Sequence, residues 1–291
     1  MHTAAEVIAR THLAKAEEYW LHDLLGKAHA AMALALNAGV HPSDVFDRQR
    51  TIDAELAART HGELVRLDEH LMAEVPQDCE PKRRDTVLSV CWGAWAEVGQ
   101  LWNVHWGKPV LITIFGSRDA ALFMHSRYGY YAERREVHKV CLPPDVAQSR
   151  GLLEIAALHE IAHAAVHDVA GDAISRWLDE GIAVWTEGGS SPVESRRLRL
   201  AALQDRVPSI ERIEAAFGNY AVDLDSGQAA IAYAVAGSFV GHLVETSGLL
   251  AMRHLLREIR QHGDTPRTFR RALGFDQRRA EREWRSRLAS R

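Results

Sequence analysis

Apolar residues recur at helical spacing through the first part of the chain, where Ala, Leu, Glu and Arg predominate. Trp20 and Leu24, four positions apart, follow this period. The pattern breaks before Pro42, and the Ser-Asp pair directly after that proline is suited to cap a second helix that reaches about Leu71. We therefore predict a helical N-terminal region over residues 1–80, whose apolar faces pack together; binding of a partner by these helices is the alternative.

A different pattern begins near Lys108. The β-branched run Val110–Phe115 has the length of a strand, and a second run, Glu136–Leu142, ends at two prolines. Helical spacing returns from Leu152 onward. Because strands and helices are segregated along the chain, the pattern favours an α+β fold over a doubly wound sheet. Within a second domain, residues 81–291, we expect strands at about 108–142, two helices at about 152–188 and a helical C-terminal subdomain at 190–291.

The composition is that of a soluble globular protein, because 47% of the 291 residues are hydrophobic and 25% are charged. The net charge of −4 gives no general attraction to nucleic acid, and we interpret the arginines near the C-terminus as solvated helix faces. Three widely spaced cysteines without a CxxC pair argue against a disulfide framework or a cysteine zinc site. With no signal peptide and no apolar stretch of ~20 residues, we predict a cytoplasmic protein without a membrane span or a nucleic-acid partner.

The pentapeptide His159-Glu160-Ile161-Ala162-His163 lies in an apolar, helix-forming stretch. On a helix, side chains four positions apart share one face, so the two imidazoles can bind one zinc ion with Glu160 beside them. Two histidines and a glutamate in apolar surroundings would be costly without such a role. The pattern therefore indicates a metal site.

A catalytic zinc ion needs a third protein ligand and an open position for water. The glycine and histidine of the metzincin pattern are missing after His163. His167 is disfavoured, because three ligands along one helix cannot easily surround a tetrahedral ion, and Asp168 and Asp172 are expected in a turn. Glu180 is the favoured third ligand, since it lies among apolar neighbours on a second helix that a short connection can fold back against the first.

The segments HEIAH and WLDEGIAVWTE together resemble the gluzincin metallopeptidases, and more narrowly the bacterial peptidase MA-like proteins with their HExxH and WLxEGxA motifs. The resemblance extends from about Lys108 to the C-terminus. It implies a mostly helical, thermolysin-like zincin fold, zinc as the cofactor, and a peptide or protein as the substrate. It also implies that His159, His163 and Glu180 are zinc ligands and that Glu160 is the catalytic base.

Two further roles follow from this resemblance. Glu187, seven residues after Glu180, would orient a ligand histidine from outside the metal's coordination sphere, with a water-exposed carboxylate at the helix end as the alternative. Tyr233 would donate a hydrogen bond to the oxyanion of the tetrahedral intermediate, with a core tyrosine as the alternative. The aminopeptidase relatives read the free amine of their substrate with a GxMEN segment, which is absent here. We interpret Glu133 as a solvent-exposed loop carboxylate, with binding of an amine as the alternative.

The favoured prediction is a zinc-dependent hydrolase, most simply a peptidase, in which Glu160 accepts a proton from water and passes it to the leaving amine. Glu136–Leu142 is the expected sheet edge for pairing with an extended peptide. The alternative is a binding or regulatory module on a zincin scaffold, or a metal-dependent enzyme that does not cleave peptides, because a fold does not fix a function.

Overall fold

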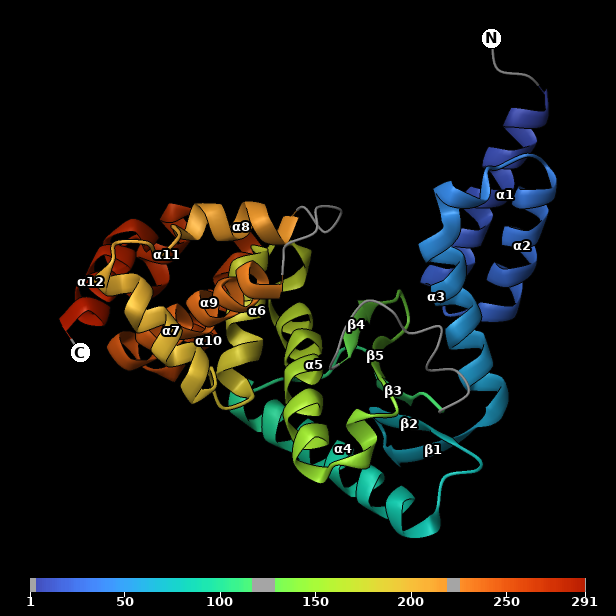
Figure 1. The fold of residues 1–291 in the computed structure, drawn as a ribbon, viewed down its shortest axis with the longest axis horizontal. Coiled ribbons are helices and arrows are strands. Elements are labelled where there is room, and N and C mark those ends of the chain that lie inside the picture. Colours follow the sequence, from blue (N-terminus) through green and yellow to red (C-terminus); the bar gives the residue numbers. More distant parts are fainter. Residues whose placement is uncertain (1–3, 117–128, 219–225, 291) are drawn as a thin grey trace. The chain divides into compact units, whose positions relative to one another are not determined.

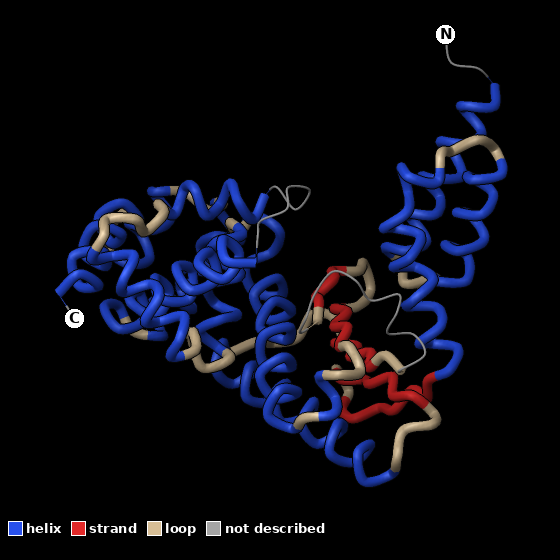
Figure 2. Tube along the Cα trace, viewed as in Figure 1, coloured by secondary structure: helices blue, strands red, loops and turns tan. Residues whose placement is uncertain are grey.

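The structure is a computed structural model that describes residues 4–116, 129–218 and 226–290 (Figure 1). It divides into two compact units. Unit 1 comprises Met1–Trp95 and Trp106–Glu160, and unit 2 comprises Ala96–His105 and Ile161–Arg291. The five strands of the described residues all belong to unit 1, whereas unit 2 is built from helices (Figure 2). Helices α4 (Pro81–Trp102) and α5 (Arg150–Ala170) contribute to both units.

Unit 1 begins with three helices, α1 (Ala4–Leu21), α2 (Leu25–Asn37) and α3 (Pro42–His61). They pack around a common apolar cluster that includes Ala28, Met32 and Ile52. Helix α3 begins with proline at its first position, where a missing N–H costs nothing. The predicted packing of apolar helix faces is therefore found over residues 4–61.

The prediction that the second helix reaches Leu71 is wrong. Residues 62–76 form an antiparallel hairpin of β1 (Gly62–Asp68) and β2 (Leu71–Pro76). The helix-forming Leu, Glu and Ala residues of this segment are outweighed by tertiary pairing, because β2 also pairs with a third strand and buries most of its side chains. Gly62 permits the turn from α3 into β1, since a Cβ atom there would lie 2.6 Å from the backbone oxygen of Ala58.

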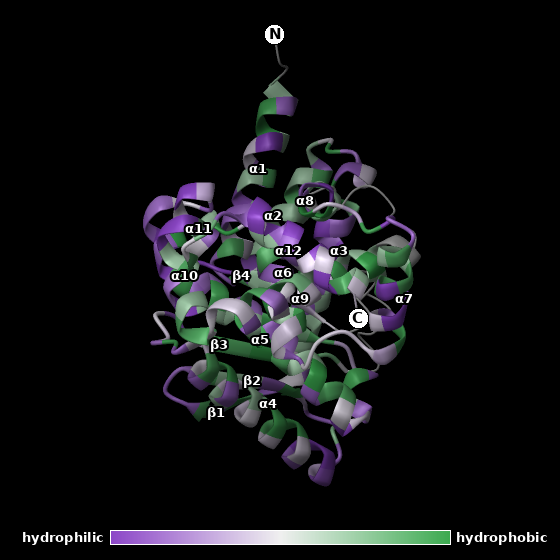
Figure 3. Cartoon of the chain, turned by 90° about the vertical axis from the view of Figure 1, so that its left-hand side faces the viewer, coloured by the Kyte–Doolittle hydropathy of each residue, from purple (hydrophilic) through white to green (hydrophobic). Residues whose placement is uncertain are grey.

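The sheet has the strand order β1-β2-β3-β5-β4, where β3 is Val110–Ile114, β4 is Tyr130–Glu133 and β5 is His138–Leu142. The strands β2, β3 and β5 are parallel, and the outer strands β1 and β4 are antiparallel to their neighbours. Every residue of β3 and β5 is buried, and β3 is coloured hydrophobic in Figure 3. The strands predicted near 110–115 and 136–142 are thus present.

The prediction that Glu136–Leu142 is a sheet edge is wrong. Strand β5 pairs with β3 on one side and with β4 on the other, so that β4 forms the edge. The sequence gives little sign of β4, because four residues with mixed polarity do not form a recognisable strand pattern. The burial of every residue of β5 is in fact typical of an internal strand.

Unit 2 is helical throughout its described residues, as predicted for the C-terminal part of the chain. Its helices are α6 (Arg176–Thr186), α7 (Pro192–Leu203), α8 (Ile210–Gly218), α9 (Ser226–Ser247), α10 (Leu249–His262), α11 (Pro266–Leu273) and α12 (Gln277–Ser290). Helix α9 packs closely on α6, because a Cβ atom at Gly181 would lie 2.6 Å from the backbone oxygen of Ala236. One stretch of α9, Ala229–Ser247, is long and apolar enough to cross a membrane, but half of it is buried in the protein, as is usual for a core helix.

Together, the small mixed sheet and the predominance of helices are compatible with the predicted α+β class. The segregation of strands and helices holds except in the N-terminal region, where β1 and β2 follow three helices. These two strands join the same sheet as β3, so the N-terminal residues belong to unit 1 rather than standing apart from the sheet.

Candidate metal centre

Helix α5 presents the two histidines of the HExxH pentapeptide on one side. His159 and His163 are one turn apart, and the side chain of His163 is 8% exposed. The residues between and around them, such as Ile161 and Ala162, are fully buried. These neighbouring apolar residues pack into the protein and fix the direction in which both imidazoles point.

Helix α6 is held at its N-terminus by carboxylates from distant parts of unit 2. Glu214 of α8 accepts hydrogen bonds from the backbone N–H groups of Arg176 and Trp177, at 3.2 and 2.8 Å. Asp264 accepts a bond from the N–H group of Ser175 at 3.1 Å, and burial raises the pKa of this carboxyl. These acceptors satisfy N–H groups that a helix leaves open at its start, and their position near the positive end of the helix dipole is favourable.

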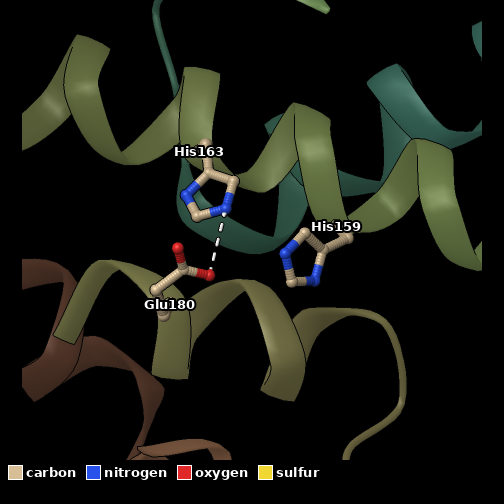
Figure 4. Close-up of side chains that lie close together, drawn as sticks. All are labelled: His159, His163 and Glu180. Atoms are coloured by element: carbon tan, nitrogen blue, oxygen red, sulfur yellow. Dashed lines mark ion pairs between the residues drawn. The ribbon is translucent and has the colours of Figure 1, made fainter. Parts of the chain in front are cut away.

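Helix α6 then brings Glu180 to the histidines of α5. One ligand atom from each of His159, His163 and Glu180 lies within 4.8 Å of the others, and we call these three residues the metal group (Figure 4). The Nε2 atom of His163 is 3.6 Å from Oε2 of Glu180, which is longer than a hydrogen bond. Two ligand atoms on one tetrahedral zinc ion lie about 3.4 Å apart, so the observed separation suits a shared ion. Two imidazoles and a carboxylate are also the donor set that zinc accepts in catalytic sites.

Asp179 contacts the His163 ring of the metal group on the side away from Glu180. Its Oδ1 atom lies 2.8 Å from Nδ1 of His163, on the side of the ring opposite to the Nε2 atom that faces Glu180. Its second oxygen lies 3.4 Å from Nε2 of His167, and His167 also approaches Asp172 at 3.5 Å. Burial raises the pKa of Asp179, but the two histidines outweigh this effect and hold it well below its usual range. Asp179 therefore stays a carboxylate and orients the ring of His163.

A family model of the peptidase MA superfamily matches residues 136–290, which is more than half of the chain. The chain belongs to the peptidase MA superfamily. The matched range begins two residues before β5 and includes both helices that carry the metal group. Membership supports a peptidase or a related zincin-like function, and peptidases of this clan are typically zinc-dependent. A search of curated proteins returns no match.

Asp179 is the residue of this peptidase MA protein that sequence reasoning missed. The resemblance assigned the supporting role to Glu187, which ends α6 as its C-terminal cap residue and is half-buried. The signal for Asp179 was available, because it directly precedes Glu180 in the WLDEG segment. Asp179 contacts the ring of His163, which Glu180 also faces. This contact depends on how α5 and α6 are rotated relative to each other. The role of Glu187 stays a prediction.

We expect Asp179→Asn to weaken zinc affinity about 10–100-fold, because the charge that orients and polarises His163 is lost while the side-chain size is kept. The measurement is a competition titration of the purified protein against a zinc chelator. Asp205→Asn is the matched control, since Asp205 is an exposed carboxylate of the same unit. Glu187→Gln, titrated in parallel, tests the role that the resemblance gives to residue 187. Equal zinc affinity in Asp179→Asn and the wild type would contradict the role of Asp179.

Glu160, the predicted base, is buried on α5 with 5% of its surface exposed. The backbone before β4 packs against it, because a Cβ atom at Gly129 would lie 3.2 Å from the Cγ atom of Glu160. Gly129 also has a φ of +148° and lies close to the backbone oxygen of Cys141, so only glycine fits there without strain. The start of the edge strand is thereby held beside the predicted base.

The remaining predicted residues lie in defined surroundings. Tyr233 is half-buried on α9, and its ring contacts the ring of Phe217 edge-on, with centroids 5.2 Å apart. Its predicted role at the oxyanion stays a prediction. Glu133 ends β4 and accepts a hydrogen bond from Nζ of Lys108 at 2.7 Å. The interpretation of Glu133 as a loop carboxylate is therefore wrong, because it lies on a strand and forms an ion pair.

Proposed function

We propose that this member of the peptidase MA superfamily is a zinc-dependent hydrolase that cleaves peptide bonds, with a thermolysin-like gluzincin arrangement of its metal site. His159, His163 and Glu180 would hold the ion. The observation that carries the proposal is the convergence of these three ligand atoms within 4.8 Å, with a carboxylate 2.8 Å from the far side of the His163 ring. Catalytic zinc sites combine three protein ligands with an orienting second layer in this way.

Glu160 would serve as the general base. A bound zinc ion supplies Lewis acidity that polarises the scissile carbonyl and lowers the pKa of water toward ~7. Glu160 is one residue from His159 and is not in the metal group, so it would act on water rather than bind the ion. It would accept a proton from water and return it to the leaving amine.

Strand β4 would bind the substrate. It stands at one end of the strand order, and an edge strand can extend its sheet by pairing with an extended peptide. The backbone at Gly129, directly before β4, packs on Glu160. A peptide paired with β4 would therefore run beside the base, which supports a peptide or protein as the substrate class.

The test combines metal analysis with unbiased cleavage. We expect about one zinc ion per chain after purification or reconstitution, as a three-ligand site implies. The protein is incubated with a peptide mixture from a digested proteome, with and without a chelator, and new termini are identified by mass spectrometry. Zinc-dependent new termini support the proposal. A zinc-loaded protein that produces none contradicts peptidase action and favours the binding-module or non-proteolytic alternative.

A further inference from the structure

A buried carboxylate of the N-terminal helices binds the hairpin that contains the edge strand. Glu55 of α3 is fully buried, and it accepts a hydrogen bond from the phenol of Tyr130, the first residue of β4, at 2.8 Å. Arg134, which directly follows β4, donates to both oxygens of Glu55 at 2.8 and 3.1 Å. The ammonium of Lys139 on β5 lies 3.1 Å away. One carboxylate thus binds β4 at both ends.

The two cations of this cluster, Arg134 and Lys139, are paired with the carboxylates of Glu55 and Asp23. Burial raises the pKa of Glu55, but Lys139 and Arg134 outweigh it and lower the pKa below its usual value. The phenol of Tyr130 has its pKa raised by burial and by nearby acidic groups, so it stays protonated and donates to Glu55. A buried charge pair is costly to desolvate and still costlier to break, because the remaining charge is left without compensation.

Helix α1 binds the same hairpin at the turn after β4. The backbone N–H of Arg135 donates to the backbone oxygen of Leu21 at 2.8 Å. The guanidinium of Arg134 lies over the ring of Trp20, 3.5 Å from its centre. Lys139 donates to Asp23, in the connection that follows α1, at 2.8 Å. The contact between the N-terminal helices and the β4–β5 hairpin therefore includes side chains, backbone and a ring face.

This contact connects the N-terminal helices to the backbone beside Glu160. Tyr130 binds α3 through its phenol, and the residue immediately before it, Gly129, packs on the Cγ atom of Glu160. A shift of β4 away from α3 would therefore also move the backbone that touches the predicted base. This contact differs from ordinary packing contacts, because it joins the N-terminal helices to the strand that lies beside the predicted base.

We infer that Glu55 is a positioning residue for substrate binding, which holds the edge strand β4 in place through Tyr130 and Arg134. The inference rests on the proposed function for the role of β4 as the peptide-binding strand. By this inference, the N-terminal helices support β4, the strand that binds the substrate.

The test uses Tyr130→Phe in the full chain, because this variant removes only the phenol that Glu55 binds. Glu55→Gln would leave two buried cations poorly compensated and is prone to unfold. Two experiments are made: hydrogen–deuterium exchange of the β4 amides in the zinc-loaded protein, and steady-state kinetics (KM and kcat) for one peptide cleaved in the unbiased digest. Tyr19→Phe is the matched control, since it removes a phenol from α1, among the same helices.

We expect β4 amides to exchange about tenfold faster in Tyr130→Phe, the effect of losing about 1.4 kcal/mol of local stability. KM should rise about 3–10-fold while kcat, zinc content and the exchange of α5 stay at wild-type values. Tyr19→Phe should match the wild type. A uniform fall in stability without a selective change in β4 or in KM would overturn the inference. If the wild type cleaves nothing, the proposed function fails, and unchanged β4 exchange would separately overturn the support of β4 by Glu55.

Discussion

Glu160→Gln is expected to lower peptide turnover about 10²–10⁴-fold and to leave zinc content and Tm at their wild-type values. Glutamine has nearly the same size and polarity, so the buried position on α5 keeps its packing. Its amide cannot take a proton from water, and general-base assistance is lost. Since Glu160 is not in the metal group, the ion should remain bound.

The control is Glu154→Gln, which makes the same change on the same helix. Glu154 lies on the solvent side of α5 in an ion pair with Arg150 at 2.8 Å, and its loss should leave turnover unchanged. Zinc content, thermal unfolding and turnover are measured side by side for the three proteins. Turnover by Glu160→Gln at the wild-type rate would exclude Glu160 as the base. It would favour the alternative in which the chain is a binding module.

His163→Ala is expected to reduce zinc occupancy from about one ion per chain to near zero at micromolar zinc, and to abolish turnover with it. The variant removes a nitrogen of the metal group and also deprives Asp179 of its 2.8 Å partner. The measurement is the zinc content after dialysis, by atomic emission, together with circular dichroism to verify the fold.

His254→Ala serves as the matched control, because His254 is an exposed imidazole on α10 of the same unit. It should retain the full zinc content. Wild-type occupancy in His163→Ala would show that the ion is held elsewhere, and the ligand assignment would then be wrong.

The helices that carry the metal group could be predicted from the sequence because their signals are local. The HExxH spacing fixes two imidazoles on one face of any helix, and the apolar stretch around it specifies that helix. The approach of Glu180 could be expected from the short connection after Ala170, and the structure has this approach. Membership of the peptidase MA superfamily agrees with this part of the interpretation.

The features that were missed all depend on contacts between distant segments. Strand β2 has the composition of a helix and becomes a strand because β3 lies beside it. Asp179 is next to the expected ligand, yet its bond to His163 follows from the relative rotation of α5 and α6. Glu55 lies in the middle of a helical pattern, and its three donors come from 75 or more positions later in the chain. The spacing of apolar residues along one segment contains no information on partners from distant segments.

The carboxylates at the start of α6 have a consequence for the use of this segment outside its own protein. A peptide of residues 150–188 contains the whole metal group, but it lacks Glu214 and Asp264, which complete the first turn of α6. Each missing cap costs about 0.5–2 kcal/mol of helix stability, and an isolated helix of 11 residues is already marginal in water. The HExxH and WLDEG segments are therefore not expected to form the zinc site on their own. Grafting them into another scaffold requires equivalent hydrogen-bond acceptors for the N–H groups at the start of the second helix.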